Sequence, residues 1–315
     1  MFDIIGKRYW FLAFSALILI PGLISIALWR IPVSIDYKGG TVYHMEFPAG
    51  TAVTDADVAA VYAEQAISDA QVVTVVGDEG APPAFQVRSS EVTPEAKAKL
   101  DAALEARFGP HTTMRFESVG ASVGRMVTVN AAIAVLLSAL AICFYLTVQF
   151  RHMQHPVRYG VAAIVSLIHD VLLVLGVASL LGHFLHWEID ALFLTALLTV
   201  IGFSVHDSIV VFDRIRENSG RLRGMPYERI VNHSIVQTLD RSINTQLTAL
   251  FTLVAIYVFS SGQLERFLFW LILGLISGTY SSIANAAPIL VIWANREWRG
   301  WFGRGRRDGG VVTAA

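Results

Sequence analysis

Two histidine–aspartate pairs interrupt long apolar runs of the sequence. His169-Asp170 lies within SLIHDVLLVLG, and His206-Asp207 lies within LLTVIGFSVHDSIVVF. An ionisable side chain near the middle of a membrane helix costs about 2.5–3.5 kcal/mol on insertion scales, so such groups usually face a bundle interior and mark an ion or proton path. The two pairs therefore predict a proton pathway inside a membrane domain, with Asp207 as its first candidate.

A polar stripe opens the apolar stretch that follows. Arg241, Thr245, Thr248 and Thr252 are spaced i, i+4, i+7 and i+11, which places them on one helical face. We expect Arg241 and Asp207 to meet at comparable depth. Burial favours the neutral form of a carboxyl and a nearby arginine favours its charged form, so relative movement of the two helices would load and release a proton. A static ion pair, with threonines that only bond between helices, is the alternative.

The composition indicates the class of protein that holds these groups. The chain has 315 residues, of which 54% are hydrophobic and 16% charged, as in a polytopic membrane protein. A helix needs about 20 apolar residues to cross a bilayer. Six stretches qualify: 11–29, 127–150, 159–181, 191–212, 242–259 and 267–293.

Local features refine these spans. The first is interpreted as a retained span kinked at Pro21, not as a cleaved leader. The last carries Gly274, Gly278 and Ser282 at every fourth position, a pattern that lets helices approach closely. The single cysteine, Cys143, excludes an intramolecular disulfide and a cysteine metal cluster.

The distribution of lysine and arginine predicts the orientation. Basic residues gather in the short connections on the side of the N-terminus, whereas the connections at 182–190 and 260–266 together hold only Arg266. Cytoplasmic loops carry the excess of positive charge, so both termini are predicted to lie in the cytoplasm. The basic cluster could also bind anionic lipid or a partner, but a topology signal is the favoured interpretation.

The region between the first two spans has its own pattern. Strand-like runs at 41–47, 70–77, 84–90 and 111–118 alternate with helix-like runs at 54–66 and 93–109. Thr54 and Thr93 are suited to cap the two helices. The order β-α-β-β-α-β is that of a ferredoxin-like domain. This region shows no catalytic constellation, so we expect it to bind or to do mechanical work, and we expect the chain not to be an enzyme.

The predicted organisation therefore has four parts. They are the N-terminus with the first span (1–30), an extracytoplasmic ferredoxin-like domain (31–125), a five-helix transmembrane bundle (126–296) and a basic cytoplasmic tail (297–315). The fold class is a polytopic α-helical membrane protein with six transmembrane helices and an inserted α+β domain.

Six ordered motifs resemble those of the SecF proteins, the smaller subunits of the SecD–SecF complex of bacterial protein export. The motifs are Asp36-Tyr37-Lys38-Gly39-Gly40-Thr41, Val119 to Gly124, His169-Asp170-Val171, Gly202 to Asn218, Thr238 to Ser242, and Gly278 to Ser282. The resemblance extends over essentially the whole chain. Three positions depart from it: His206 replaces the usual Asn, Ala121 replaces Pro, and Ser260-Ser261-Gly262 replaces a Gly-Gly pair.

The resemblance implies a six-span half of an RND-type transporter, completed by SecD, in the cytoplasmic (inner) membrane. Such complexes use the proton-motive force to promote late steps of preprotein translocation. The implied partners are SecD, SecYEG, unfolded preprotein on the outer side and membrane lipids, with YajC and YidC as further candidates. No cofactor beyond the proton gradient and no nucleic acid are implied.

The family's proton-pathway residues correspond to Asp207, Arg241 and Asp170 of this sequence. His206 adds a second titratable group beside Asp207, and His169 adds one beside Asp170. Two functions of other classes stay open at this point: a scaffold subunit that transports nothing, and an RND-like permease for lipid or drug.

Overall fold

The computed structural model describes residues 3–75 and 82–297 of the 315-residue chain. They divide into two compact units, a helical one formed by Met1–Pro32 with Ile133–Ala315, and an α+β one formed by Val33–Ala132. Each unit is described by itself. The predicted basic tail, 297–315, lies outside the described residues except for Glu297.

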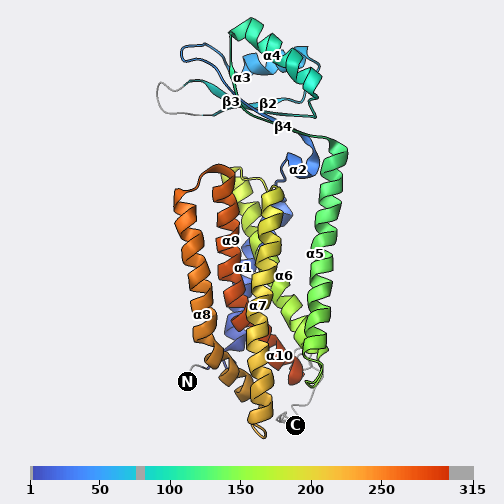
Figure 1. The fold of residues 1–315 in the computed structure, drawn as a ribbon, viewed down its shortest axis with the longest axis vertical. Helices are drawn as coiled ribbons and strands as arrows, with labels where there is room; N and C mark the ends of the chain where they lie inside the picture. Colours follow the sequence, from blue (N-terminus) through green and yellow to red (C-terminus); the bar gives the residue numbers. More distant parts are fainter. Residues whose placement is uncertain (1–2, 76–81, 298–315) are drawn as a thin grey trace. The chain divides into compact units, whose positions relative to one another are not determined.

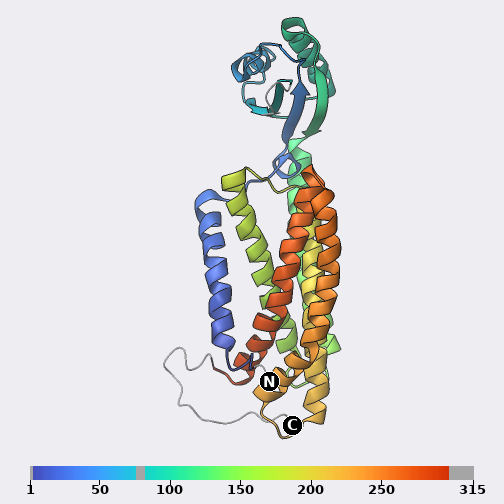
Figure 2. The ribbon, with the colours of Figure 1, turned by 90° about the vertical axis from the view of Figure 1, so that its left-hand side faces the viewer.

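Long apolar helices make up the helical unit (Figures 1 and 2). Within the described residues, six helices are long and apolar enough to cross a membrane, which confirms the prediction of six spans. They are α1 (Arg8–Trp29), α5 (Ala121–Gln149), α6 (Val157–Leu185), α7 (Ala191–Arg221), α8 (Tyr227–Phe259) and the composite last span of α9 (Gly262–Ser281), η1 (Ser282–Ala286) and α10 (Ala287–Ala294).

The π-helical turn η1 in the last span was not predicted. Pro288 stands in the first turn of α10, directly after this turn. Proline has no backbone N–H and its ring crowds the carbonyl four residues earlier, which disfavours a regular α-helical turn before it. The π-helical turn lies between α9 and α10, as a single-turn insertion in an otherwise α-helical span.

Helices α7 and α8 extend well beyond their apolar runs. The predicted spans end at 212 and begin at 242, whereas the helices end at Arg221 and begin at Tyr227. Hydropathy cannot detect the added turns because they are charged. Ion pairs between neighbouring turns support the α7 extension: Arg216–Asp213 at 2.6 Å, Arg214–Glu217 at 2.7 Å and Arg221–Glu217 at 2.8 Å.

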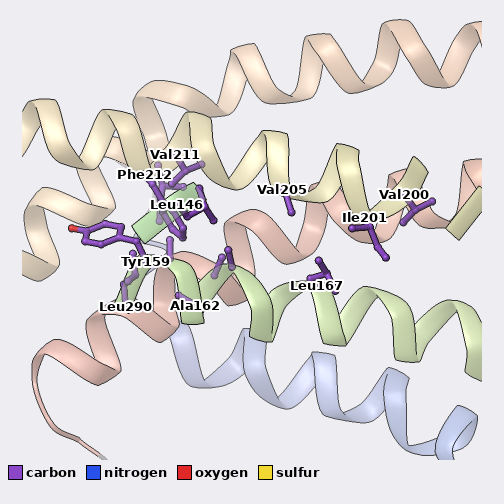
Figure 3. Packing of buried hydrophobic residues seen from close by; sticks show 14 of the residues in the cluster. Leu146, Tyr159, Ala162, Leu167, Val200, Ile201, Val205, Val211, Phe212 and Leu290 are labelled. Atoms are coloured by element: carbon purple, nitrogen blue, oxygen red, sulfur yellow. The ribbon is translucent and has the colours of Figure 1, made fainter. Parts of the chain in front are cut away.

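The bundle has inner and outer helices. About half of the apolar segment is buried in α6 (50%), α7 (50%) and the last span (56%), compared with 17% for α1, 6% for α5 and 11% for α8. Figure 3 shows the apolar cluster between α6 and α7, with Tyr159 and Leu167 on α6 facing Val205 and Phe212 on α7. The side chains on the buried faces of these three segments are therefore shielded from lipid by protein.

Glycines permit the closest helix contacts. A Cβ at Gly176 of α6 would lie 2.7 Å from the Cα of Gly22 in α1, and a Cβ at Gly274 of α9 would lie 2.1 Å from a Val200 methyl group in α7. Neither distance is possible for real atoms, so only glycine fits at these crossings. The small-residue face predicted in the last span thus packs against α7.

The α+β unit has the predicted ferredoxin-like topology. Its elements are β1 (Gly40–Glu46), α3 (Asp55–Glu64), β2 (Gln71–Val75), β3 (Ala84–Ser89), α4 (Pro94–Phe108) and β4 (Thr112–Val119), preceded by a short helix α2 (Ile35–Lys38) that was not predicted. The antiparallel sheet has the order β2-β3-β1-β4. Thr54 caps α3 in a capping box with Asp57, and Thr93 caps α4.

The apolar face of this sheet packs under α3 and α4. Alternate residues of β1, Tyr43 and Met45, are fully buried, together with Val61 of α3 and Leu100 of α4. The Tyr43 hydroxyl donates to Asp101 Oδ1 at 2.7 Å. Burial first, and then the neighbouring Asp101 carboxylate, raise the pKa of Tyr43 above its usual range. The tyrosine therefore stays neutral at physiological pH.

The entry motif of this unit joins the start of the domain to its end. Gly39 and Gly40 have positive φ angles of 76° and 121°, which favour glycine. A Cβ at Gly39 would lie 2.7 Å from the Cα of Ala121. Thr41 is buried and accepts from Val92 N at 2.8 Å. Asp36 lies in α2. The motif is a structural junction within the unit.

The glycine crossing of α1 and α6 yields a direct test. Gly176→Ala should lower the thermal unfolding temperature of the purified chain in detergent, because the added methyl group forces the two helices apart and overpacking costs about 1–3 kcal/mol. Gly202→Ala is the matched control, since a Cβ there meets nothing within 4 Å. Equal unfolding temperatures for the two variants would show that the α1–α6 contact is not tight.

Candidate functional site

Asp170 is the centre of a buried polar cluster that joins three helices. It lies on α6 and is only 1% exposed. The hydroxyls of Ser204 on α7 and Ser281 on α9 donate to Oδ2 at 2.6 and 2.7 Å, and Ser277 on α9 donates to Oδ1 at 2.6 Å. His169 Nδ1 lies 3.1 Å from Oδ1. Four groups thus fill the acceptor positions that a carboxylate offers.

The cluster continues toward α1 through aromatic and amide groups. The His169 ring lies 6.1 Å from the Tyr280 ring, and the Tyr280 hydroxyl donates to the carbonyl of Phe11 at 2.7 Å. Ser15 of α1 donates to Asn285 Oδ1 at 2.8 Å. Asn285 belongs to the π-turn η1. This network links the first span to the irregular part of the last one.

Asp207 is the second buried carboxyl, and it has fewer partners. It lies on α7 and is 2% exposed. Its hydrogen bond comes from Gln246 Nε2 on α8, and Gln246 is itself 7% exposed. Ser204, which donates to Asp170, stands three positions before Asp207 on the same helix, so both belong to one face of α7. Within the described residues, Asp207 has one hydrogen-bond donor where Asp170 has four.

The structure separates the two members of the second histidine–aspartate pair. Neighbouring positions on a helix point about 100° apart, and His206 is exposed while Asp207 is buried. In the first pair both members are buried, with His169 at 7%. Within the described residues His169 Nε2 has no hydrogen-bond partner.

The expected ion pair between Asp207 and Arg241 is not formed in this structure. Arg241 is exposed on α8, and no oxygen of Asp207 lies within 4.0 Å of its guanidinium nitrogens in this part of the chain. Arg241 instead lines a polar cavity of about 350 Å³ with Asp213, Glu217 and Thr238. Gln246, one turn further along α8, takes the position expected for the arginine.

The predicted threonine stripe lies on the outside of the bundle. Thr245 and Thr248 are exposed, and their hydroxyls donate to the carbonyls of Arg241 and Asn244 on their own helix. They line a groove of about 590 Å³ together with Phe203, Leu253 and Leu275. Ser282, in contrast, is buried and donates to Thr279 O at 3.1 Å.

Sequence reasoning missed the side chains that bind the two carboxyls. Ser204, Ser277 and Ser281 are placed at Asp170 by packing between helices, and Gln246 is placed at Asp207 in the same way. The sequence held one indication of these partners, because Ser277 and Ser281 continue the helix face marked by Gly274 and Gly278.

Within the described residues, no group of three or more His, Cys, Asp or Glu side chains could hold a metal ion.

The fold and the site together define a polytopic helical membrane protein that has buried carboxyls in its bundle and an inserted α+β domain. Residues 99–296 match the family model "Protein export membrane protein SecD/SecF, C-terminal". The chain is 48% identical to the protein translocase subunit SecF of Anaerolinea thermophila over 98% of this chain and 99% of that one. It is 43% identical to the SecF of Thermobaculum terrenum, covering 95% and 96%.

A solved structure agrees with these relatives. The crystal structure of SecDF from Thermus thermophilus, described as a translocon-associated membrane protein, is similar with a TM-score of 0.76 and 32% identity. The similarity covers 94% of this chain and 39% of that one. The chain therefore belongs to the SecF family of protein translocase subunits, and the resemblance deduced from its motifs is confirmed.

The Asp170 cluster can be tested with two adjacent serines. Ser281→Ala should destabilise the purified chain by about 1–3 kcal/mol, because it leaves a buried acceptor one donor short. Ser282→Ala is the control, since Ser282 is equally buried and, within the described residues, its hydroxyl donates to Thr279 O in the same span and not to Asp170. Unfolding by heat in detergent measures both. A larger loss for Ser282→Ala would contradict the assigned role of Asp170.

Proposed function

We propose that the chain is an auxiliary subunit of the Sec protein translocase that couples proton movement through Asp207 to late steps of preprotein translocation. The observation that carries this proposal is the contrast between two buried carboxyls, one with four donors and one with a single donor. The family membership supports the translocase role. The relatives are named as translocase subunits, not as enzymes.

The contrast favours Asp207 as the group that takes up and releases the proton. Protonating a carboxylate removes acceptor capacity, so every donor that already points at it must turn away or lose its bond. Three serine hydroxyls and a histidine would have to rearrange around Asp170, whereas among the described residues only Gln246 donates a hydrogen bond to Asp207. Asp170 is then a fixed cross-link of α6, α7 and α9, and Asp207 is the exchangeable site.

A polar cavity supplies a route from one end of the bundle. The cavity lined by Arg241, Asp213 and Glu217 also includes Ile209, two positions after Asp207. Water in such a cavity can bring a proton to within about one helical turn of the carboxyl. We place the proton entry or exit of Asp207 there.

Movement of α8 provides the switch in this proposal. Gln246 and Arg241 are five positions apart on α8, which is about 7.5 Å at 1.5 Å per residue. An arginine side chain can reach several ångströms along a helix, so a shift of α8 would replace Gln246 by Arg241 at Asp207. The amide contact leaves Asp207 without a cationic partner, and the arginine contact would favour its charged form.

The exposed polar stripe of α8 supports a second membrane subunit. Only 11% of the apolar segment of α8 is buried, yet its outer face carries Arg241, Thr245 and Thr248 beside the groove of about 590 Å³. A stripe of this polarity is more favourable against protein or water than against lipid. We propose that SecD covers this face, because the similar SecDF structure joins a region like this chain to a longer polypeptide.

The location and the remaining partners follow from this role. We propose the cytoplasmic (inner) membrane with both termini inside, since Lys7, Arg8 and Arg158 lie at one end of the bundle while the connections at 186–190 and 260–261 contain no lysine or arginine. The α+β unit would then meet unfolded preprotein on the outer side, near SecYEG. YajC and YidC are candidates for the same assembly.

The available energy limits the mechanical step. One elementary charge that crosses 100 mV yields about 2.3 kcal/mol, which can bias a conformational change but cannot unfold a stable domain. The α+β unit is therefore proposed to act as a ratchet or clamp on a chain that is already extended.

The variant Asp207→Asn distinguishes a proton-coupled subunit from a scaffold subunit that transports nothing. The change keeps the shape of the side chain, so the subunit should accumulate and bind SecD as the wild type does. It should reduce export to the level that the wild type reaches when an ionophore collapses the proton gradient. Export of a reporter preprotein into inverted membrane vesicles, with and without the gradient, measures this.

Asp240→Asn is the matched control, because its side chain is exposed on the neighbouring helix α8 and does not line the cavity beside Asp207. It should retain gradient-dependent export. If Asp207→Asn retained it as well, the scaffold function would stand and proton coupling at Asp207 would be excluded.

A further inference from the structure

A cationic pocket lies at the end of the bundle where α6 and α8 begin. It has a volume of about 300 Å³ and is lined by the α5–α6 connection, the first turns of α6 and α8, the last turns of α7, and α10. Its arginine and histidine lining residues are His152, His155, Arg158, Arg216 and Arg223, and none of the described residues that line it is an aspartate or glutamate. An anion is the ligand that such a lining fits.

Two of the arginines have no acidic partner. Within residues 3–75 and 82–297, Arg158 and Arg223 form no ion pair, whereas Arg216 pairs with Asp213 at 2.6 Å and Arg214 and Arg221 pair with Glu217. His152 accepts a hydrogen bond from Arg151 at 3.2 Å, which brings a further cation close to the rim. The pocket therefore carries uncompensated positive charge, unlike the neighbouring charged turns of α7.

The N-terminus of α6 adds to this positive field. Helix α6 begins after Pro156 without a side-chain cap and has no acidic residue in its first turn, whereas the first turn of α8 contains Glu228. The helix dipole favours an anion at such an N-terminus. The Tyr159 hydroxyl points out of the apolar cluster toward this end (Figure 3) and lies 3.2 Å from the Tyr227 hydroxyl, which offers further donors.

The floor of the pocket is apolar. Leu290 is buried, Met153 and Ala294 are half-buried, and all three line the pocket together with the ring of Tyr159. A small inorganic anion would leave this floor uncovered, whereas a phosphate ester would place its polar head between the arginines and its carbon part on the floor. Basic pockets at the ends of membrane helices bind lipid headgroups in this way.

We propose that this pocket is a binding site for the phosphate group of an anionic phosphate ester, with Arg158 and Arg223 as its cationic contacts. The chemistry is shared by the headgroup of an anionic phospholipid and by a soluble phosphate. Bound phosphate would tie the start of α6 to the connection between α7 and α8, which is the end of the bundle where the cavity beside Asp207 opens. The site is separate from the buried carboxyls and does not depend on the proposed proton coupling.

Native mass spectrometry of the full chain in detergent tests the proposal. The probes are short-chain phosphatidylglycerol, short-chain phosphatidylcholine and inorganic phosphate. Phosphatidylglycerol should bind, and Arg158→Gln with Arg223→Gln should weaken its binding by about tenfold or more, since two charge-assisted contacts are lost. Arg214→Gln with Arg221→Gln removes the same number of charges outside the pocket and should change binding by less than about twofold.

The remaining outcomes identify the source of the phosphate or overturn the site. Competition of millimolar inorganic phosphate with the lipid would assign the pocket to the phosphate group, and binding of phosphate alone would assign it to a soluble ligand. Equal losses in both double variants, or equal binding of the two lipids, would overturn the proposal. Arg223 lies in the exposed connection after α7, so replacing it does not disturb the packed core. Arg223→Gln alone should therefore weaken lipid binding even if the double variant does not fold.

Discussion

The cost of burying the Asp170 carboxyl governs the architecture of the bundle. A buried charge without partners is prohibitively unfavourable, and this one is compensated only when α6, α7 and α9 come together so that three serines and His169 meet it. The same three segments are the most buried of the spans. The glycines of α9 let it approach α7 closely enough for the serines on that face to reach the carboxyl. One polar requirement therefore fixes which helices are inner and which are outer.

The position of Asp207 follows from that constraint. Once Ser204 is held against Asp170, the next turn of α7 must place Asp207 on the same side of the helix. There it contacts Gln246 of α8, an outer helix of which little is buried. We propose that Asp170, held by its donors, in this way positions Asp207 as the exchangeable carboxyl. The mechanism proposed here uses this difference, because only the helix opposite Asp207 has to move.

The sequence was sufficient for those features that depend on local pattern or on length. Apolar runs of about 20 residues located the spans, Thr54 and Thr93 marked the starts of α3 and α4, and the order of strands and helices predicted the sheet. The charged turns of α7 and α8 escaped a method based on hydropathy, and Pro288 alone did not reveal the π-turn before it. Asp170 and Asp207 were found because an acid in an apolar run is costly.

The partners of these acids could not be predicted, because they come from other helices and depend on rotation and depth. Arg241 was the expected partner of Asp207, since opposite charges attract, but Gln246 occupies that position in this structure. The choice between them is a difference of five positions along α8. Pattern and charge fix the face of a helix, but not a shift of that size.

The central claim is that Asp207 is the carboxyl that takes up and releases the proton. Infrared difference spectra of the purified chain, recorded as the pH is lowered, report the C=O stretch of each carboxyl that becomes protonated. The account predicts a protonation band that is absent in Asp207→Asn and retained in Asp170→Asn. A band that survives in Asp207→Asn and disappears in Asp170→Asn would contradict it.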